Sequence, residues 1–314
     1  MARGLLIGGG VAALVSGLAA AALVVAVTMT EPPEAHVERY LEALAADQLP
    51  AAAALSGLEP GDALPLGDEG EPTVLRVVAA QPRDGGRVAV TALYGGDNDA
   101  ATVIFLLEPA ERLAGIIPQW RFVEPPVARI PVGVDQHTEL IVSGRPLTTP
   151  GPGETAIATA FIPARVSVAN AEPFLDAAST RIRPRSVAPP PVILTATPSE
   201  RLVREVERQL TEVLDTCATQ EVLQPSGCPF GRAVTGDRVI DRPAWMRVDA
   251  PQVSLALSAN PGRFSLDGSA TMRVEVEVQS LFDGTVSRLT EDVVADVSGI
   301  VVLGPDGPVV TVYP

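Results

Sequence analysis

The pattern of apolar and polar positions begins with a long uncharged run. Residues 4–29 carry no charged side chain, and this run exceeds the ~20 residues with which a helix crosses a bilayer. It is too long for the apolar core of a cleaved signal peptide. Arg3 precedes the run and Glu31 follows it, which predicts a cytoplasmic N-terminus and an extracytoplasmic remainder. We expect residues 1–30 to form a single-pass transmembrane anchor in the cell membrane.

The next segment, residues 31–126, predicts a helix followed by antiparallel strands. Its first apolar residues recur with the i, i+3, i+4, i+7 spacing of a helix; they are Val37, Tyr40, Leu41 and Leu44. Residues 51–55 can form a second short helix. Four runs with strand character follow, separated by glycine-rich turns; they are residues 73–80, 87–94, 101–107 and 119–123. This order predicts an α+β domain.

Residues 127–186 predict a small β-domain, and a proline-rich linker follows at residues 187–197. The strands expected in the β-domain are residues 129–134, 138–142 and 156–168. Proline and glycine turns separate them. The run Ala188–Pro191 favours a stiff, extended connection to the last segment.

Residues 198–314 predict a second domain built from a helix and an antiparallel sheet. The sequence Thr197–Glu200 has the pattern of a capping box, with Thr197 as the N-cap and Pro198 at the first helical position. The helix presents one apolar stripe, formed by Leu202, Val206, Leu210, Val213 and Cys217. Strands are expected after it at residues 245–248, 252–259, 271–281, 286–297 and 309–313.

Two parts of this pattern resemble known families. The run from Val37 to Leu49, the alanine-rich helix after it and the strands ending in Gln119–Phe122 are similar to an NTF2-like (cystatin-like) domain. That resemblance implies a long helix across a curved sheet, often around a pocket. Residues 120–146 resemble small β-domains in the extracytoplasmic part of TcaA-type membrane proteins, although no zinc ribbon precedes the expected anchor here.

Charge and composition narrow the chemistry. The chain of 314 residues has a formal net charge of −15, which disfavours binding to nucleic acid. Every basic residue is arginine. The lack of lysine excludes Schiff-base and general-base lysines and the phosphate-binding lysine of a P-loop.

The only two cysteines, Cys217 and Cys228, predict a disulfide, since the chain is expected outside the cytoplasm. It would close a loop of about twelve residues and stabilise the fold by about 3 kcal/mol. The alternatives are weaker. Two thiols without neighbouring histidines do not make a zinc site, and the spacing is not that of a redox-active C-x-x-C motif.

No catalytic signature is present. The two histidines, His36 and His137, have no acid and nucleophile beside them in the sequence, and none of the common hydrolase or nucleotide-binding motifs occurs. Asp97–Asp99 contains oxygen atoms that could bind calcium, but it lacks the Gly and Glu of an EF-hand loop. We therefore interpret it as an acidic turn. If residues 31–126 form an enzyme pocket, Tyr40, Asp47 and His36 are the nearest candidates, but Tyr40 lies on the apolar stripe and is expected in the core.

These observations lead to one functional hypothesis and one alternative. We expect a non-catalytic, membrane-anchored protein that binds an envelope protein or ligand, as a scaffold or regulatory module, with no cofactor and no metal. TcaA-type resemblance implies a role in cell-wall stress. The NTF2-like resemblance also fits subunits of secretion and conjugation channels, which would imply that the protein is a scaffold for the assembly of such a channel. The alternative is a hydrolase or isomerase that uses an NTF2-like pocket.

Overall fold

The computed structural model describes residues 31–58, 76–95, 101–110 and 119–313. Of the described residues, 49% lie in strands and 17% in helices. The expected α+β class is therefore wrong, because the protein is mostly β-sheet. The predicted transmembrane helix is not supported: residues 1–30 lie outside the described residues, and no described helix is long and apolar enough to span a membrane.

The chain separates into two compact units. Unit 1 contains residues 1–130, 157–167 and 181–190, and unit 2 contains residues 131–156, 168–180 and 191–314. Each unit is thus assembled from separate stretches of the chain. Four strands, β5, β8, β9 and β11, cross the divisions; they are Val127–Val134, Thr155–Phe161, Val166–Asn170 and Thr180–Ile182.

Unit 1 begins with two helices, α2 (Pro33–Ala45) and α3 (Leu49–Ser56). The predicted first helix is confirmed, and its residues Val37, Tyr40 and Leu41 are buried. Proline stands in the first turn of both helices, where its missing N–H costs no hydrogen bond.

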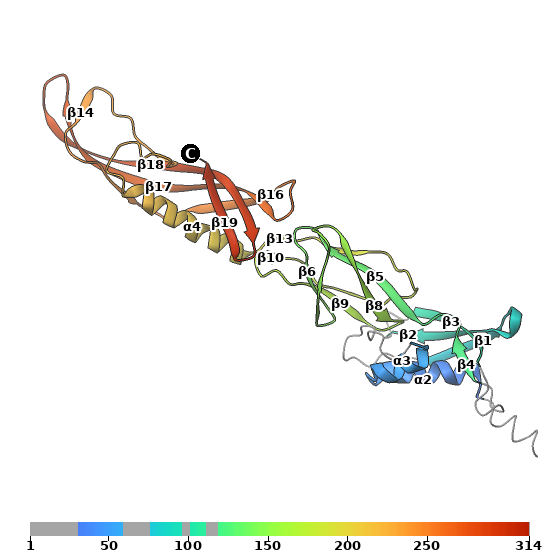
Figure 1. The fold of residues 1–314 in the computed structure, drawn as a ribbon. Coiled ribbons are helices and arrows are strands. Elements are labelled where there is room, and N and C mark those ends of the chain that lie inside the picture. Colours follow the sequence, from blue (N-terminus) through green and yellow to red (C-terminus); the bar gives the residue numbers. More distant parts are fainter. Residues whose placement is uncertain (1–30, 59–75, 96–100, 111–118, 314) are drawn as a thin grey trace, which may run out of the picture. The chain divides into compact units, whose positions relative to one another are not determined.

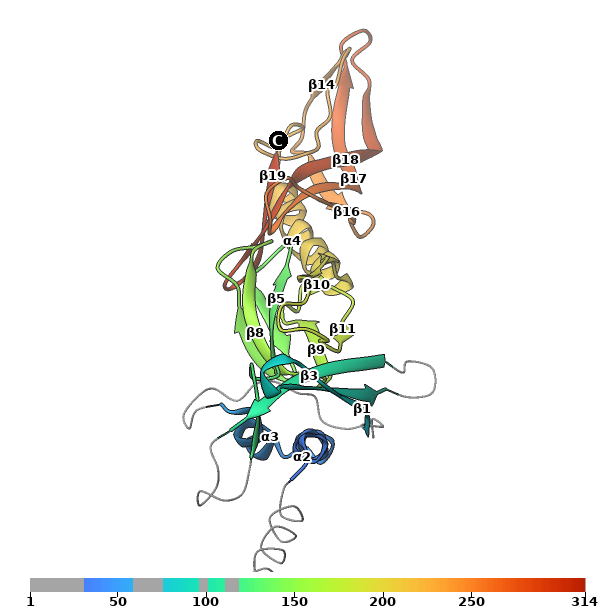
Figure 2. The ribbon, with the colours of Figure 1, turned by 90° about the vertical axis from the view of Figure 1, so that its right-hand side faces the viewer.

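The helices pack against one face of a four-stranded antiparallel sheet (Figure 2). Its strands, in the order β1-β2-β3-β4, are Arg76–Pro82, Val88–Tyr94, Ala101–Pro109 and Trp120–Phe122. Side chains alternate across β3, so that Val103, Phe105 and Leu107 are buried whereas Ile104 and Leu106 are exposed. One face of the sheet therefore forms the core with the helices, and the other carries exposed apolar side chains.

Short strands occupy residues 127–198. A three-stranded sheet has the order β12-β5-β8, and a four-stranded sheet has the order β11-β9-β6-β7. The strands not yet given are β6 (Glu139–Val142), β7 (Arg145–Thr148), β10 (Leu175–Asp176), β12 (Val192–Leu194) and β13 (Thr197–Pro198). Within the segment predicted as a linker, β12 pairs in parallel with β5, and β13 pairs with β10.

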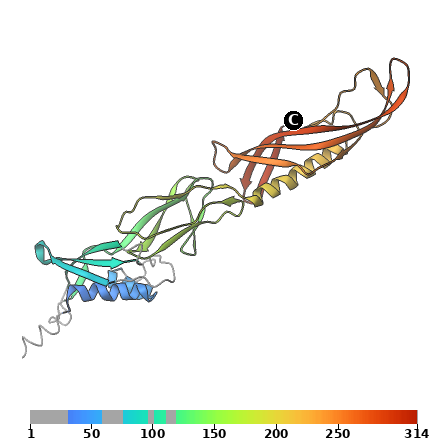
Figure 3. The same ribbon diagram turned by 180° about the vertical axis from the view of Figure 1, so that it is seen from behind.

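The longest helix, α4 (Glu200–Ala218), packs on the sheet of unit 2 through one apolar stripe (Figure 3). Its buried residues are Leu202, Val206, Leu210, Leu214 and Cys217. The predicted cap is wrong by two residues. The N-cap is Ser199, whose hydroxyl accepts a hydrogen bond from the Leu202 N–H, whereas Thr197 lies in β13.

The sheet of unit 2 is built around β17 (Arg263–Ser280), which forms a hairpin with β18 (Val286–Gly304) (Figure 1). One edge of β17 pairs with β18, and its other edge pairs with three strands; they are β14 (Asp237–Val239), β15 (Ala244–Arg247) and β16 (Gln252–Leu257). Finally, β19 (Gly307–Tyr313) pairs with the end of β18.

Both hairpin strands are longer than the sequence predicts. The strand expected at residues 271–281 begins instead at Arg263 and passes through Gly268. A Cβ atom at Gly268 would lie 2.9 Å from the Gln252 carbonyl oxygen. Glycine therefore stands inside this strand because the neighbouring strand approaches closely, and it does not mark a turn.

The position of the cap gives a first prediction. Ser199→Ala removes the side-chain oxygen that satisfies the Leu202 N–H, and we expect the free energy of unfolding to fall by about 1 kcal/mol. Thr197→Ala is the matched control and should change it much less, because Thr197 caps no helix. Chemical denaturation of both variants measures the difference. Equal losses, or a larger loss for Thr197→Ala, would contradict this assignment.

Candidate functional site

Unit 1 contains an apolar cavity of about 290 Å³ beside β3. Exposed side chains of β3, Ile104 and Leu106, form part of its lining. The rest comes from β4 and from residues 123–126, 162 and 185–187. Among the described residues of the lining, Glu124 and Arg185 are the charged ones. The cavity is thus an apolar hollow with one charge of each sign.

Backbone hydrogen bonds hold the walls of this cavity. The Val123 N–H donates to the Leu106 carbonyl oxygen at 2.9 Å. Val187, another lining residue, is held by the Arg129 N–H, which donates to the Val187 carbonyl oxygen at 2.7 Å. Because the lining is fixed by main-chain contacts, the hollow is built into the fold of unit 1.

The residues proposed for an enzyme pocket lie elsewhere. Tyr40 is fully buried beneath the sheet, and its hydroxyl donates to the carbonyl oxygens of Pro126 and Ile162 at 3.3 and 2.8 Å. Burial raises the pKa of Tyr40 well above the usual range of tyrosine, although the hydrogen bond to Ile162 opposes this. The hydroxyl therefore stays protonated, and the expected core role of Tyr40 is confirmed.

His36 and Asp47 do not join Tyr40 in a site. The His36 Nε2 atom lies 3.1 Å from the Leu55 carbonyl oxygen, and its ring packs on Phe122 with centroids 5.1 Å apart. Burial lowers the pKa of His36, and the hydrogen bond to Leu55 opposes the shift. Asp47 is exposed in the turn after α2, with φ 56°. None of the three residues proposed for a pocket lines the cavity.

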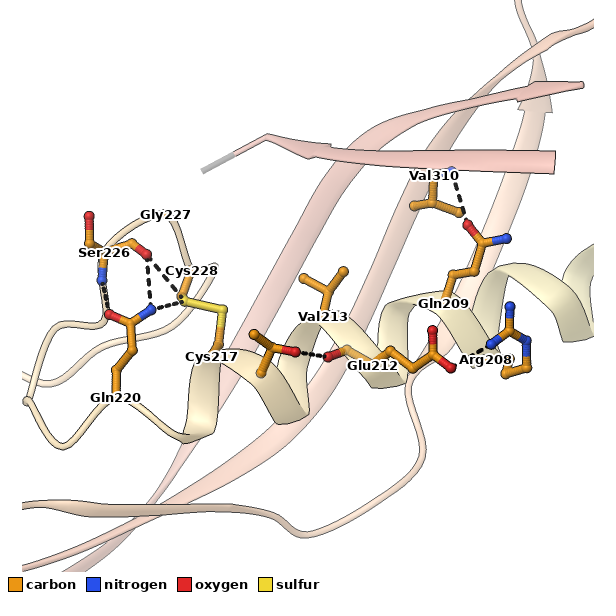
Figure 4. A pocket seen from close by; sticks show the side chains of 11 residues that line it. Arg208, Gln209, Glu212, Val213, Cys217, Gln220, Ser226, Gly227, Cys228 and Val310 are labelled. Atoms are coloured by element: carbon orange, nitrogen blue, oxygen red, sulfur yellow. Dashed lines mark hydrogen bonds and ion pairs between the residues drawn. A yellow bond between two sulfur atoms is a disulfide. The ribbon is translucent and has the colours of Figure 1, made fainter. Parts of the chain in front are cut away.

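A second hollow, an open groove of about 550 Å³, lies in unit 2 between the end of α4, the loop after it and β19 (Figure 4). The disulfide Cys217–Cys228 forms part of its lining. The predicted disulfide is thus confirmed, with Cα atoms 5.9 Å apart. It joins the last turn of α4 to the loop.

A side-chain amide reinforces the disulfide. The Gln220 Oε1 atom accepts from the Ser226 N–H at 2.9 Å, and its Nε2 atom donates to the Ser226 carbonyl oxygen at 3.2 Å (Figure 4). At the other end of the groove, Gln209 donates to the Pro308 carbonyl oxygen and accepts from the Val310 N–H. Gln220 thus closes the loop on itself, and Gln209 attaches β19 to α4. Both side-chain amides are engaged in structural contacts.

Charged groups in and beside the groove are paired with one another. Arg208 forms ion pairs with Glu205 and Glu212 along α4. The hydrogen bonds from Arg208 and Gln209 lower the pKa of Glu205 to about 2, and Glu205 raises the pKa of Arg208 above its usual range. Glu205 is consequently a permanent anion at neutral pH and not a proton donor.

Comparisons with protein-family models, with curated proteins and with solved structures find no match to this chain. The resemblance to NTF2-like and TcaA-type proteins therefore stays a prediction.

The remaining sequence candidates do not build a further site. Burial lowers the pKa of His137, and its Nδ1 atom accepts a hydrogen bond from the Glu139 N–H at 3.1 Å. Asp97–Asp99 lies outside the described residues. Among the residues that the structure describes, no cluster of three or more His, Cys, Asp or Glu side chains could hold a metal ion.

Sequence reasoning missed the residues that line the cavity. Ile104 and Leu106 belong to a run of apolar residues, 103–107, in which no polar alternation marks the outer face. A continuous apolar run predicts a strand buried on both faces. The run therefore does not show whether the outer face of the strand is buried or exposed as part of a cavity.

The disulfide gives a second prediction. Replacing both cysteines, Cys217→Ser with Cys228→Ser, should lower the free energy of unfolding by about 3 kcal/mol, because the unfolded chain regains the entropy of an open loop. Trp245 reports this region, since its indole N–H donates to the Val222 carbonyl oxygen in the loop. Denaturation followed by tryptophan fluorescence measures the loss.

Gln220→Ala is the control for that experiment, because it removes the amide contacts and keeps the disulfide. We expect it to cost about 1 kcal/mol, the usual worth of a hydrogen-bonded side chain. If the double cysteine variant lost no more than Gln220→Ala, the disulfide would not be the main constraint on the loop.

A third prediction follows from the pKa of Glu205. Its pKa in the folded protein, about 2, lies below its ordinary value of 4.5. The ionised Glu205 side chain therefore stabilises the folded protein fully above about pH 4.5, and this stabilisation is lost as the pH falls towards 2. The stability difference between the wild type and Glu205→Gln should be constant at higher pH and shrink across this window.

Urea denaturation at a series of pH values measures this difference. Glu207→Gln is the matched control for removal of one carboxylate from α4, because Glu207 forms no ion pair in the described part of the chain. A difference for Glu205→Gln that stayed constant down to pH 2 would show that the ion pair does not depress this pKa.

Proposed function

We propose that this protein is a non-catalytic, extracytoplasmic binding module that takes an apolar side chain of a partner protein into the cavity of unit 1. The observation that carries this proposal is the exposed apolar lining of the cavity. Ile104 is 65% exposed beside it. Clustered exposed apolar side chains are uncommon on monomers, and they mark places where another molecule binds.

The size and lining of the cavity support a protein partner. Its volume of about 290 Å³ lies just below the ~300–1,000 Å³ typical of small-molecule pockets. One large apolar side chain fills such a space, as the anchor residues of protein interfaces do. Glu124 and Arg185 on its rim can orient the polar backbone around that anchor.

The chemistry of the lining supports binding over catalysis. A hydrolase or isomerase needs an acid or base placed with the other groups of its reaction. The described lining contains one carboxylate, Glu124, and no histidine, and His36, Tyr40 and Asp47 do not line the cavity. The disulfide supports an extracytoplasmic location, since such bonds persist in oxidising compartments. Attachment to a membrane stays a prediction from residues 4–29.

A fourth prediction tests this function. The full chain is crosslinked in intact cells of its host and recovered through a C-terminal tag. Ile104→Asp places a charge in the apolar lining, and burying that charge against a partner would be costly. We expect recovery of the specific partner to fall about tenfold, which corresponds to about 1.4 kcal/mol of binding free energy.

Thr102→Asp provides the matched control. Thr102 is exposed on the same strand and the same face as Ile104 but does not line the cavity. It should leave recovery of the partner unchanged. A partner captured equally by both variants binds elsewhere, and that result would overturn the proposed function of the cavity.

A further inference from the structure

One edge of the hairpin in unit 2 has no strand beside it. β18 pairs with β17 from Val286 to Val302, but it pairs with β19 only from Ser298 onward. In the described part of the chain, residues 286–297 therefore have no strand on their outer edge. Such an edge presents a row of backbone groups to which a further strand can bond.

The even-numbered residues of this edge direct their backbone groups outward. On the far side of β17, Glu277 and Thr271 accept hydrogen bonds through their carbonyl oxygens from Ile240 and Val248. Odd-numbered residues of β17 thus bond away from β18. Because bonding alternates along an antiparallel pair, odd-numbered residues of β18 bond to β17. Even-numbered ones keep N–H and C=O groups free for another strand.

The same even-numbered residues carry exposed side chains. Val286 and Val294 are 57% and 59% exposed. Arg288 and Asp292, which lie between them, are also exposed. The outward-facing sequence is therefore apolar, positive, neutral, negative and apolar, with Thr290 at its centre.

This order is complementary to itself when the strand is reversed. If two copies pair antiparallel about Thr290, Arg288 of each copy lies opposite Asp292 of the other. Val286 then lies opposite Val294. Opposite charges and apolar side chains that face each other across strands stabilise a sheet.

Neighbouring registers are worse. An axis at Arg288 or at Asp292 places two like charges directly opposite each other. If the axis lies at Leu289 or at Glu291, Arg288 of one copy no longer lies opposite Asp292 of the other, and the opposite-charge pairs are lost. Two opposed residues of an antiparallel ladder must both direct their backbone groups at each other or both away. Only the even-numbered residues of this edge direct theirs outward, so registers that pair even with odd positions are excluded.

We propose that the free edge of β18 pairs with the same edge of a second copy of this chain, antiparallel and with a two-fold axis at Thr290. The two sheets then become one continuous sheet. Within each copy, Arg273 pairs with Asp292 at 2.6 Å and Glu275 pairs with Arg288 at 2.6 Å. The dimer extends these pairs into one row of alternating charges across four strands.

Site-directed crosslinking of the purified full chain tests this arrangement. The described part of the chain has no free cysteine, so a new cysteine supplies a single reactive thiol. Thr290→Cys places its two copies opposite each other, about 5.5 Å apart between Cα atoms. A short bis-maleimide should convert this variant into a covalent dimer on a denaturing gel.

Val294→Cys is the positional control. In the proposed register its two copies lie roughly 27 Å apart, at eight residues along the strand, and a short linker cannot join them. It should give no dimer alone, but it should crosslink when mixed with Val286→Cys. Equal crosslinking of Thr290→Cys and Val294→Cys, or none for Thr290→Cys, would overturn the proposal.

Charge reversal tests the register without relying on one variant. In the Thr290→Cys background, Arg288→Asp and Asp292→Arg each place like charges opposite each other. Each should lower the dimer yield about tenfold. An equal mixture of the two variants restores both opposite-charge pairs and should recover the crosslink. Failure of the mixture to recover would show that charge does not set the pairing.

Discussion

Unit 2 depends on the backbone hydrogen bonding of β17. This strand is paired along both edges, with β18 on one side and with three shorter strands on the other. Its side chains alternate between the core and solvent, so Phe264, Leu266, Met272 and Val274 are buried. Only the pairing of β17 places the three short strands in one sheet, and that sheet supplies the surface on which α4 packs.

The groove and the free edge both follow from that arrangement. Docking of α4 on the sheet brings Gln209, in the middle of the helix, beside β19, and the disulfide fixes the following loop to the last turn of α4. Because β19 is short, it covers only the final part of β18. The rest of the long strand keeps an edge whose charges permit one pairing register and oppose others, which protects it from indiscriminate association.

The sequence predicts elements better than it predicts their arrangement. The stripe beginning at Val37 and the disulfide of Cys217 and Cys228 were both found, because helical spacing and a lone cysteine pair are local signals. The N-cap of α4 was misplaced from Ser199 to Thr197, since both residues fit a cap and only β13 excludes the second. Gly268 was not recognised inside a strand, because the close approach that explains it involves a distant residue.

The fold class and the cavity needed information that no local pattern contains. Strands such as β12 form only because a distant partner exists, so the share of β-structure was underestimated. Ile104 gives no signal of its exposure, since the apolar run around it is also compatible with full burial. What separates the two outcomes is whether another segment covers the outer face of β3.

The hydroxyl of Tyr40 has a consequence for how the protein can be made. It joins α2 to backbone groups at Pro126 and Ile162, and unit 1 also includes residues 181–190. The ribosome synthesises α2 long before these acceptors. The first sheet can cover the ring of Tyr40, but its hydroxyl has no Ile162 acceptor until more than a hundred further residues have been added. A gene fragment cut after the first sheet would encode an incomplete core, and dissection of this protein has to follow the units, not the order of the sequence.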